Sequence, residues 1–434
     1  MGEVASEKST IGLAMAGGAP EGAVYEIGVL RALDDAIEGL DFNNLCAYVG
    51  ISAGAFINAS LVNKVTTAQL VRALLNIDPN EQPFDPGMFL SPAFSQYLKS
   101  GLMVPRLLME AARDYLIYKE DHTIVKSLTR LSRALPVGLF DNEPLRRYLE
   151  RVFNRPERTD DFRKLDNKLF VVAVELDTGQ AVVFGQPGKD HVPISRAVQA
   201  STALPGLYPP VKIDGKNYVD GVLRRTLHAS TVLDEGAKLV ICINPIVPVD
   251  TGRAVEEGFL REPNLTERGM PSILSQTFRT LIYSRMKVGF RRYDKHYEDT
   301  DLVLFEPSPD DYRMFFTNIF SFAKRKVVAE HAYTNTIRDL ANRADELTPI
   351  FEKHGLKLRH EVIFHPEPNL WRSVGVADPT TKKKTRRRHR VTNNLNDALA
   401  HLEAVIAAKK AARATQEAQA KQQEQQEQTE QPVG

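Results

Sequence analysis

The N-terminal part of the chain combines two strand-like segments with one helical segment between them. Residues 11–16 and 45–49 are short apolar runs, and the apolar side chains between them recur at spacings of three and four residues, at Ile27, Leu30, Leu33, Ile37 and Leu40. This spacing predicts a helix with one buried face. Because a helix that connects two neighbouring strands makes them parallel, we expect a parallel sheet with helices covering its faces. Later strand candidates are residues 168–175, 181–184, 238–244 and 301–305.

Length and composition exclude several classes of protein. The 434 residues suffice for one large domain or two ordinary ones, and a net charge of +1 gives no case for a specific nucleic-acid partner. Cys46 and Cys242 lie in apolar, strand-like runs, so we expect buried free thiols in a reducing compartment. The first residues contain no apolar signal-peptide core, and no run of about 18 apolar residues occurs. These features predict a cytoplasmic protein.

A Gly-x-Ser-x-Gly motif stands where the second strand-like segment passes into a helix. The residues are Gly50-Ile51-Ser52-Ala53-Gly54. A nucleophilic serine needs a tight, strained turn of this kind, and its neighbours two positions away must be small because strand and helix approach closely there. The turn also places the following N–H and the helix N-terminus beside Oγ, where an oxyanion would form. Ser52 is therefore a candidate nucleophile.

A glycine-rich loop, residues 16–22, lies between the first strand and the first helix. Successive glycines, Gly17 and Gly18, let backbone N–H groups turn toward one point, and the helix that follows adds its positive end. Such a loop suits an oxyanion, and it also suits a phosphate. The phosphate-binding patterns Gly-x-x-x-x-Gly-Lys-Ser/Thr and Gly-x-Gly-x-x-Gly are not matched. The neighbouring serine motif favours the oxyanion.

An acidic residue follows a predicted hairpin in the middle of the chain. Asp214-Gly215 separates two short runs, which is a strong hairpin signal, and the second run ends at Val219-Asp220-Gly221. A carboxylate on a turn at a strand end can point into a cleft and accept a proton from a serine. Asp220 is therefore a candidate general base, although Asp-Gly turns are also common without any catalytic role.

The glycine-rich loop, the Gly-Ile-Ser-Ala-Gly motif and the late Asp-Gly, in this order, resemble the patatin-like phospholipases. Residues 200–210, Ala-Ser-Thr-Ala-Leu-Pro-Gly-Leu-Tyr-Pro-Pro, are similar to the segment that those proteins carry before the Asp-Gly. The matches extend from about Ile11 to Leu227. The resemblance implies a three-layer α/β/α fold with a mainly parallel central sheet. It also implies hydrolysis of lipid acyl esters by a Ser-Asp dyad that requires no histidine.

Carried over by position, the resemblance makes Ser52 the nucleophile and Asp220 the general base. It places the oxyanion hole at the backbone of Gly17, Gly18 and Ala19, together with the Ala53 N–H. It implies a lipid substrate, no cofactor and no metal. Four further glycines match motif positions of the family, namely Gly22, Gly50, Gly54 and Gly221.

The glycine-rich loop departs from the family pattern in two ways. Ala19 and Glu21 stand where the family usually has a third glycine and then Arg or Lys, and the spacing from Gly22 to Gly28 is one residue longer. Backbone donors do not depend on side-chain identity, so the oxyanion hole is compatible with these changes. A missing cation would nevertheless weaken the stabilisation of negative charge, and Glu21 would oppose it.

Two other functions remain open from the residues alone. An α/β-hydrolase would need a histidine after its acid, and His228 is the nearest one after Asp220. A weakly active or inactive lipid-binding scaffold on the same fold is the other alternative, motivated by Ala19 and Glu21. The histidines His354, His360 and His365 match no metal-binding spacing.

Composition also predicts the organisation of the chain. We expect a catalytic domain over residues 8–235, with a helical, lid-like insertion at about 77–140, followed by strands and helices over 236–375 that complete or extend it. The apolar stripe of residues 97–116 fits core packing better than a membrane-touching lid. Residues 376–434 contain a basic run, Lys382–Arg390, then a helical segment and a disordered Gln/Glu-rich tail. The basic run would allow peripheral contact with an anionic membrane.

Overall fold

The computed structural model describes residues 9–76, 86–93, 136–224, 226–256, 264–309, 311 and 322–376. The chain divides into two units, residues 1–376 and 377–434. The second unit lies outside the described residues, and so do the basic run Lys382–Arg390 and the tail that the composition predicts. Most of the expected insertion at 77–140 lies outside them as well, including the apolar stripe of residues 97–116.

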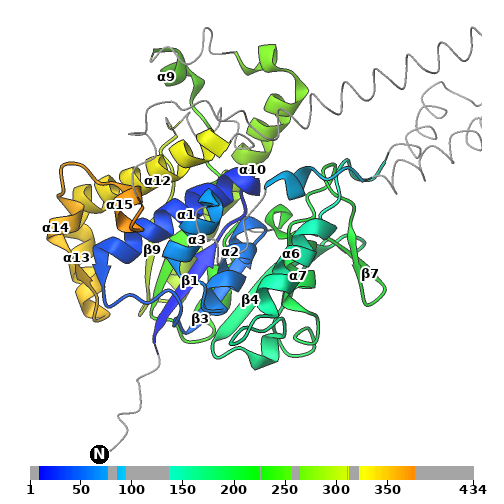
Figure 1. The fold of residues 1–434 in the computed structure, drawn as a ribbon, viewed down its shortest axis with the longest axis horizontal. Helices are drawn as coiled ribbons and strands as arrows, with labels where there is room; N and C mark the ends of the chain where they lie inside the picture. Colours follow the sequence, from blue (N-terminus) through cyan, green and yellow to red (C-terminus); the bar gives the residue numbers. More distant parts are fainter. Residues whose placement is uncertain are drawn as a thin grey trace, which may run out of the picture. The chain divides into compact units, whose positions relative to one another are not determined.

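A mixed, mainly parallel sheet forms the centre of the described part (Figure 1). Its order is β6-β7-β4-β3-β1-β8-β9, and β5 pairs with β4 beside this path. The strands from β4 to β9 in this order run parallel, whereas β5 and the β6–β7 hairpin are antiparallel to their neighbours. The strands are β1 (Ile11–Met15), β3 (Ala47–Ile51), β4 (Lys168–Glu175), β5 (Gln180–Phe184), β6 (Val211–Ile213), β7 (Lys216–Asp220), β8 (Leu239–Ile243) and β9 (Asp301–Phe305).

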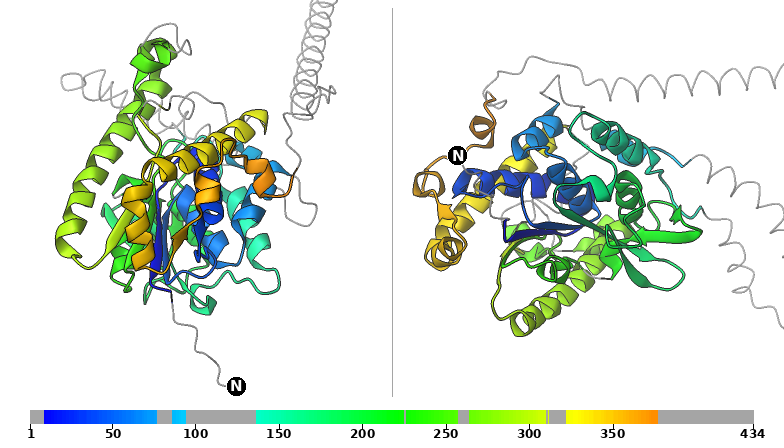
Figure 2. Two further views of the ribbon diagram at one scale, coloured as in Figure 1. Left: turned by 90° about the vertical axis from the view of Figure 1, so that its left-hand side faces the viewer. Right: turned by 90° about the horizontal axis from the view of Figure 1, so that it is seen from below.

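Helices cover both faces of this sheet. Successive side chains of a strand point to opposite faces, so Leu13 and Met15 belong to one apolar cluster, whereas Ala14 and Ala16 belong to another. The first cluster packs under α1 (Ala19–Ala36), α2 (Ala53–Val62) and α12 (Phe322–Asn342), and the second under α8 (Ala229–Leu233) and α10 (Met270–His296). The right-hand view of Figure 2 shows α1 and α10 on opposite sides of the sheet. The predicted three-layer α/β/α fold with a mainly parallel sheet is confirmed.

Shorter elements complete the described part. A second, two-stranded sheet joins β2 (Ile37–Glu38) to β10 (Lys357–Leu358). The remaining helices are α3 (Thr67–Leu75), η1 (Pro86–Leu90), α6 (Glu143–Phe153), η3 (Phe162–Lys164), α7 (Ile194–Ser201), η4 (Gly221–Leu223), α9 (Thr251–Glu256), η5 (Leu265–Arg268), α13 (Ala344–Lys353), α14 (His360–Ile363) and α15 (Leu370–Ser373). None of the helices described is both long enough and apolar enough to pass through a bilayer.

The first helix and the second strand of the sheet differ from their predicted bounds. Helix α1 ends at Ala36, so Ile37 and Leu40 lie outside it. Ile37 instead pairs with Leu358 in the small sheet, where its side chain is buried. The residue is apolar because it is buried, although it does not belong to the helix. Strand β3 begins at Ala47 and extends to Ile51, so the strand itself enters the serine motif.

The predicted hairpin is present and positions the acidic candidate. Asp214 and Gly215 both have positive φ, 50° and 81°, which is the backbone of a two-residue turn whose twist matches the strands on either side. The turn joins β6 to β7, and Asp220 ends β7 opposite Ala173 of β4. The hairpin therefore places the Asp220 carboxylate next to the central strands.

Candidate functional site

Ser52 occupies the sharp turn between β3 and α2. Its backbone has φ 51° and ψ −116°, a conformation that a residue with a side chain rarely adopts and that stores strain. The two motif glycines allow the turn, because a Cβ on Gly50 would lie 2.5 Å from the Ala55 Cα and a Cβ on Gly54 would lie 2.5 Å from the Ala16 carbonyl oxygen. The motif thus has the geometry of a nucleophile elbow.

The glycine-rich loop lies directly against this elbow. The Gly54 N–H donates to the Ala16 carbonyl at 3.1 Å, and a Cβ on Gly17 would lie 2.9 Å from the Ser52 Cβ. In the described part of the chain, no backbone or side-chain acceptor takes the N–H groups of Gly17 and Gly18. The Ala53 N–H lies in the first turn of α2, where it has no acceptor within its own helix. The glycine-rich loop and the start of α2 therefore both adjoin Ser52 and carry backbone N–H groups.

Ala19 has a left-handed backbone conformation, which a glycine would adopt without strain. Its φ is 54°, in the left-handed region, which costs a residue with a Cβ about 1 kcal/mol. Gly18 and Gly22 are needed for another reason, since a Cβ on them would lie 2.6 Å and 2.9 Å from the Pro245 Cγ. The segment after β8 therefore supports the loop from outside, and the change to Ala19 leaves its backbone path in place.

A second serine, Ser201, which belongs to no catalytic motif, holds the elbow in position. The Ser52 N–H donates to the Ser201 Oγ at 2.8 Å, and the Ser201 hydroxyl donates to the Val172 carbonyl at 2.6 Å. Ser201 is fully buried at the end of α7. Ser201 belongs to residues 200–210, the segment that resembles the patatin-like phospholipases, and this resemblance is the one indication in the sequence that the residue has a role near the site.

Asp220 approaches the serine from the end of β7, which lies one strand beyond β4 in the sheet. Its carboxylate is buried, and its Oδ1 accepts a hydrogen bond from the Val222 N–H at 2.9 Å. Burial raises the pKa of Asp220 to about 7, and the Val222 N–H and the nearby Ser52 side chain oppose this rise. Gly221 is required at this point because a Cβ would lie 2.3 Å from the Val172 carbonyl oxygen. The fold thus brings the Ser52 side chain, far away in the chain, next to the Asp220 carboxylate, where it influences the pKa of that group.

These features match one known family. The sequence model of the patatin-like phospholipases matches residues 13–233. The chain belongs to this family. Lipid acyl hydrolysis is the general activity that the family assignment supports.

Solved structures with a similar arrangement include bacterial proteins of low sequence identity. VipD from Legionella pneumophila is 15% identical, with a TM-score of 0.33, over 77% of this chain and 67% of VipD. A chain in the complex of full-length ExoU with SpcU, from the type III secretion system of Pseudomonas aeruginosa, is 13% identical, with a TM-score of 0.27. That match covers 66% of this chain and 52% of the other, so this chain spans about half of that relative's length.

A mostly buried arginine, Arg279, lies beside Glu21, the residue that stands where the family usually has a cation. Arg279 of α10 places its Nη2 atom 3.8 Å from the Glu21 Oε2, and its Nη1 donates to the Val247 carbonyl at 3.3 Å. Burial raises the pKa of Glu21 to about 7, and Arg279 opposes the rise. No sequence motif marks Arg279, so only the tertiary structure, which brings α10 close to the first turn of α1, reveals it. A positive charge is present near the loop, although it comes from another element.

His228, the histidine of the alternative triad, precedes α8. It is buried and has a left-handed backbone, with φ 47°. The groups that lower the pKa of the Asp220 carboxylate are the Val222 N–H and the Ser52 side chain. The His354 Nε2 atom lies 2.7 Å from the Oδ2 atom of Asp301, the first residue of β9. Among the described residues, no group of three or more His, Cys, Asp or Glu side chains could hold a metal ion.

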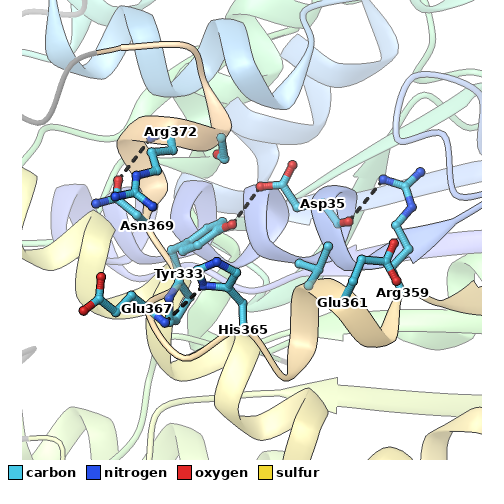
Figure 3. Close-up of a pocket in the computed structure, with 11 residues that line it drawn as sticks. Asp35, Tyr333, Arg359, Glu361, His365, Glu367, Asn369 and Arg372 are labelled. Atoms are coloured by element: carbon cyan, nitrogen blue, oxygen red, sulfur yellow. Dashed lines mark hydrogen bonds between the residues drawn. The ribbon is translucent and has the colours of Figure 1, made fainter.

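Two surface depressions in the described part lie away from the serine. One, of about 340 Å³, lies between the C-terminal end of α1, α12 and residues 359–373 (Figure 3). Its polar groups largely satisfy one another, since the Tyr333 hydroxyl donates to the Asp35 carboxylate at 2.8 Å and Arg359 donates to the Asp35 carbonyl at 3.3 Å. The other, of about 830 Å³, lies beside Asn63 and Pro193. Neither is lined by Ser52 or Asp220.

Proposed function

We propose that this protein is a serine acyl-ester hydrolase that releases fatty acids from phospholipids or related lipid esters. Ser52 is the nucleophile and Asp220 is the general base. The observation that carries the proposal is the strained elbow that holds Ser52 beside the buried Asp220 carboxylate, in a chain of the patatin-like phospholipase family. No other group is required to accept the serine proton.

The proposed reaction has two halves. Asp220 accepts the hydroxyl proton of Ser52 while Oγ attacks the acyl carbonyl, and it then gives this proton to the oxygen of the alcohol part of the lipid, which leaves. Water then attacks the acyl-enzyme while Asp220 accepts one of its protons, and Asp220 returns a proton to the Ser52 Oγ as the fatty acid leaves. The N–H groups of Gly17, Gly18, Ala19 and Ala53 are proposed to hold the tetrahedral oxyanion, where the loss of one donor of this kind costs about 10²–10³ in rate.

The organisation of the chain is part of the same proposal. Residues 8–235 form the catalytic domain, and residues 236–375 complete it, because β8 and β9 lie in the same sheet as the residues before them. We propose a cytoplasmic location with peripheral membrane contact, to which the basic run Lys382–Arg390 contributes. No specific nucleic-acid partner is proposed.

The general activity is tested with a panel of phospholipid vesicles, from which released fatty acids are quantified by mass spectrometry. We expect wild-type protein to release fatty acid, and we expect His228→Ala to retain this activity because Asp220 alone accepts the proton. Loss of activity in a folded His228→Ala variant would favour the triad of an α/β-hydrolase. A folded wild-type protein that binds vesicles but releases no fatty acid and reacts with no fluorophosphonate probe would favour the scaffold.

The Glu21–Arg279 pair makes a separate prediction about the oxyanion. Glu21→Gln removes a negative charge near the loop, so we expect kcat/KM to rise about two- to fivefold, more at pH 8 than at pH 6 because Glu21 titrates near pH 7. Arg279→Gln removes the opposing positive charge and should lower kcat/KM by a similar factor. Arg279→Lys keeps the charge and is the matched control. A ratio of Glu21→Gln to wild type that stays constant from pH 6 to pH 8 would contradict this electrostatic role.

A further inference from the structure

Helix α10 presents an apolar face to solvent on the outside of the domain. Its inward side packs on the sheet through Met286, which is 4% exposed, and carries the mostly buried Arg279. Its outward side carries a row of large apolar side chains that are 38–67% exposed, namely Met270, Ile273, Leu274, Phe278, Leu281 and Val288. We call these six residues the α10 stripe.

The spacing of the α10 stripe makes it continuous. Met270, Leu274, Leu281 and Val288 follow one another at intervals of four and seven residues, which brings them to the same side of a helix. Phe278 and Ile273 flank this row. Single exposed apolar residues are normal on a protein surface, but a contiguous group of them marks an interaction site.

The charge of α10 complements an anionic surface. The helix contains one acidic residue, Asp294, and its basic residues are Arg279, Arg285, Lys287, Arg291, Arg292 and Lys295. Arg285 and Arg292 are exposed and continue the same side of the helix beyond Leu281. Each exposed cation near an anionic bilayer adds about 1 kcal/mol of attraction. An exposed apolar row with cations further along the same side of the helix offers a bilayer apolar contact and attraction to its anionic headgroups.

The same helix is connected to the catalytic end of the sheet. Its Gln276 side chain exchanges two hydrogen bonds with the Val249 backbone, at 2.8 Å and 3.2 Å, and Arg279 reaches Glu21. Val249 lies in the segment after β8 whose Pro245 packs on the glycine-rich loop. Figure 1 and the left-hand view of Figure 2 show the N-terminal half of α10 and α9 extending past the end of the sheet near which α1 begins. Ser52 lies at that end, because it follows the C-terminal end of β3.

We propose that the α10 stripe docks this protein on an anionic lipid bilayer and thereby holds the Ser52 end of the sheet against its substrate. The proposal rests on the proposed function and adds to it the surface on which the enzyme works. A second copy of the chain is a poorer occupant of the stripe, because two helices with this excess of positive charge would repel one another. A bilayer with anionic headgroups can accommodate the apolar row among its acyl chains and attract the cations to its headgroups.

The test compares two double variants in the full-length chain. Leu274→Gln/Leu281→Gln removes the middle of the stripe at exposed positions, and Leu176→Gln/Phe364→Gln is a matched control, because Leu176 and Phe364 are 47% and 59% exposed elsewhere on the domain. Binding is measured by co-sedimentation with vesicles of phosphatidylcholine containing phosphatidylglycerol. We expect the stripe variant to bind about tenfold more weakly or worse, and the control variant to bind like wild type.

Two further measurements separate docking from catalysis. Ser52→Ala should bind vesicles like wild type, so the docking result stands whether or not hydrolysis is detected. The stripe variant should hydrolyse a short, water-soluble ester at the wild-type rate while its hydrolysis of vesicle lipid falls together with binding. Vesicle binding by the stripe variant equal to that of wild type would overturn the proposal. If wild type were a dimer and the stripe variant a monomer in sedimentation velocity, with equal vesicle binding, the stripe would instead be an interface between two copies of the chain.

Discussion

Replacement of Ser52 by alanine is expected to abolish the release of fatty acid from phospholipid vesicles, with a fall in kcat/KM of about 10⁴-fold or more. Without Oγ, Asp220 has no nucleophile to activate, and the tight elbow leaves no defined place for a water molecule to replace it. Alanine also removes the oxygen that a fluorophosphonate probe would modify. The measurements are fatty-acid release and probe labelling of the two proteins side by side.

Ser60 provides the matched control for this substitution. It is buried in the same helix, α2, where its hydroxyl donates to the Phe56 carbonyl at 2.9 Å. Ser60→Ala therefore removes a buried hydroxyl from the same region without touching the elbow, and we expect activity and labelling to persist. Fatty-acid release by Ser52→Ala at the rate of the Ser60→Ala protein would contradict the assignment of the nucleophile.

Replacement of Asp220 by asparagine is expected to lower kcat/KM by about 10²–10⁴-fold at pH 8, the usual contribution of a general base. Asparagine keeps an oxygen that can accept from the Val222 N–H, but it cannot take the serine proton. Only ionised Asp220 can act as the base, so wild-type activity should rise as the pH increases through about 7. The pH–rate profile of kcat/KM measures this limb directly. An acid limb centred near pH 4 would contradict the raised pKa.

The same carboxylate links stability to pH. The pKa of Asp220 rises from 3.8 to about 7 in the folded protein, so folding favours the protonated form. This contribution to stability is fully present below about pH 4 and is lost as the pH rises through 7. Because asparagine stays uncharged, Asp220→Asn should have a higher Tm than wild type at pH 8, and the difference should shrink toward pH 5. A Tm difference of equal size at both pH values would contradict the linkage.

The main elements of the fold follow from local patterns. Strands β4 and β9 have the predicted bounds, and β1, β5 and β8 lie within one residue of theirs at each end, because buried strands are short runs of apolar residues. The hairpin before Asp220 follows from the Asp-Gly turn. Ile37 and Leu40 show the limit of such patterns, since apolar spacing reports burial and cannot distinguish a helix face from the small sheet that buries Ile37.

The sequence by itself determined the elbow at Ser52 and the loop at Gly17 and Gly18, because a strand, a turn and a helix made of consecutive residues constrain one another locally. The tertiary structure decided everything that depends on residues meeting across the fold. It brought Asp220 to Ser52 and buried its carboxylate, which raises its pKa. It set Ser201 under the elbow and Arg279 beside Glu21, and it left the α10 stripe exposed. No local spacing encodes these contacts, since they arise from which helix packs on which side of the sheet.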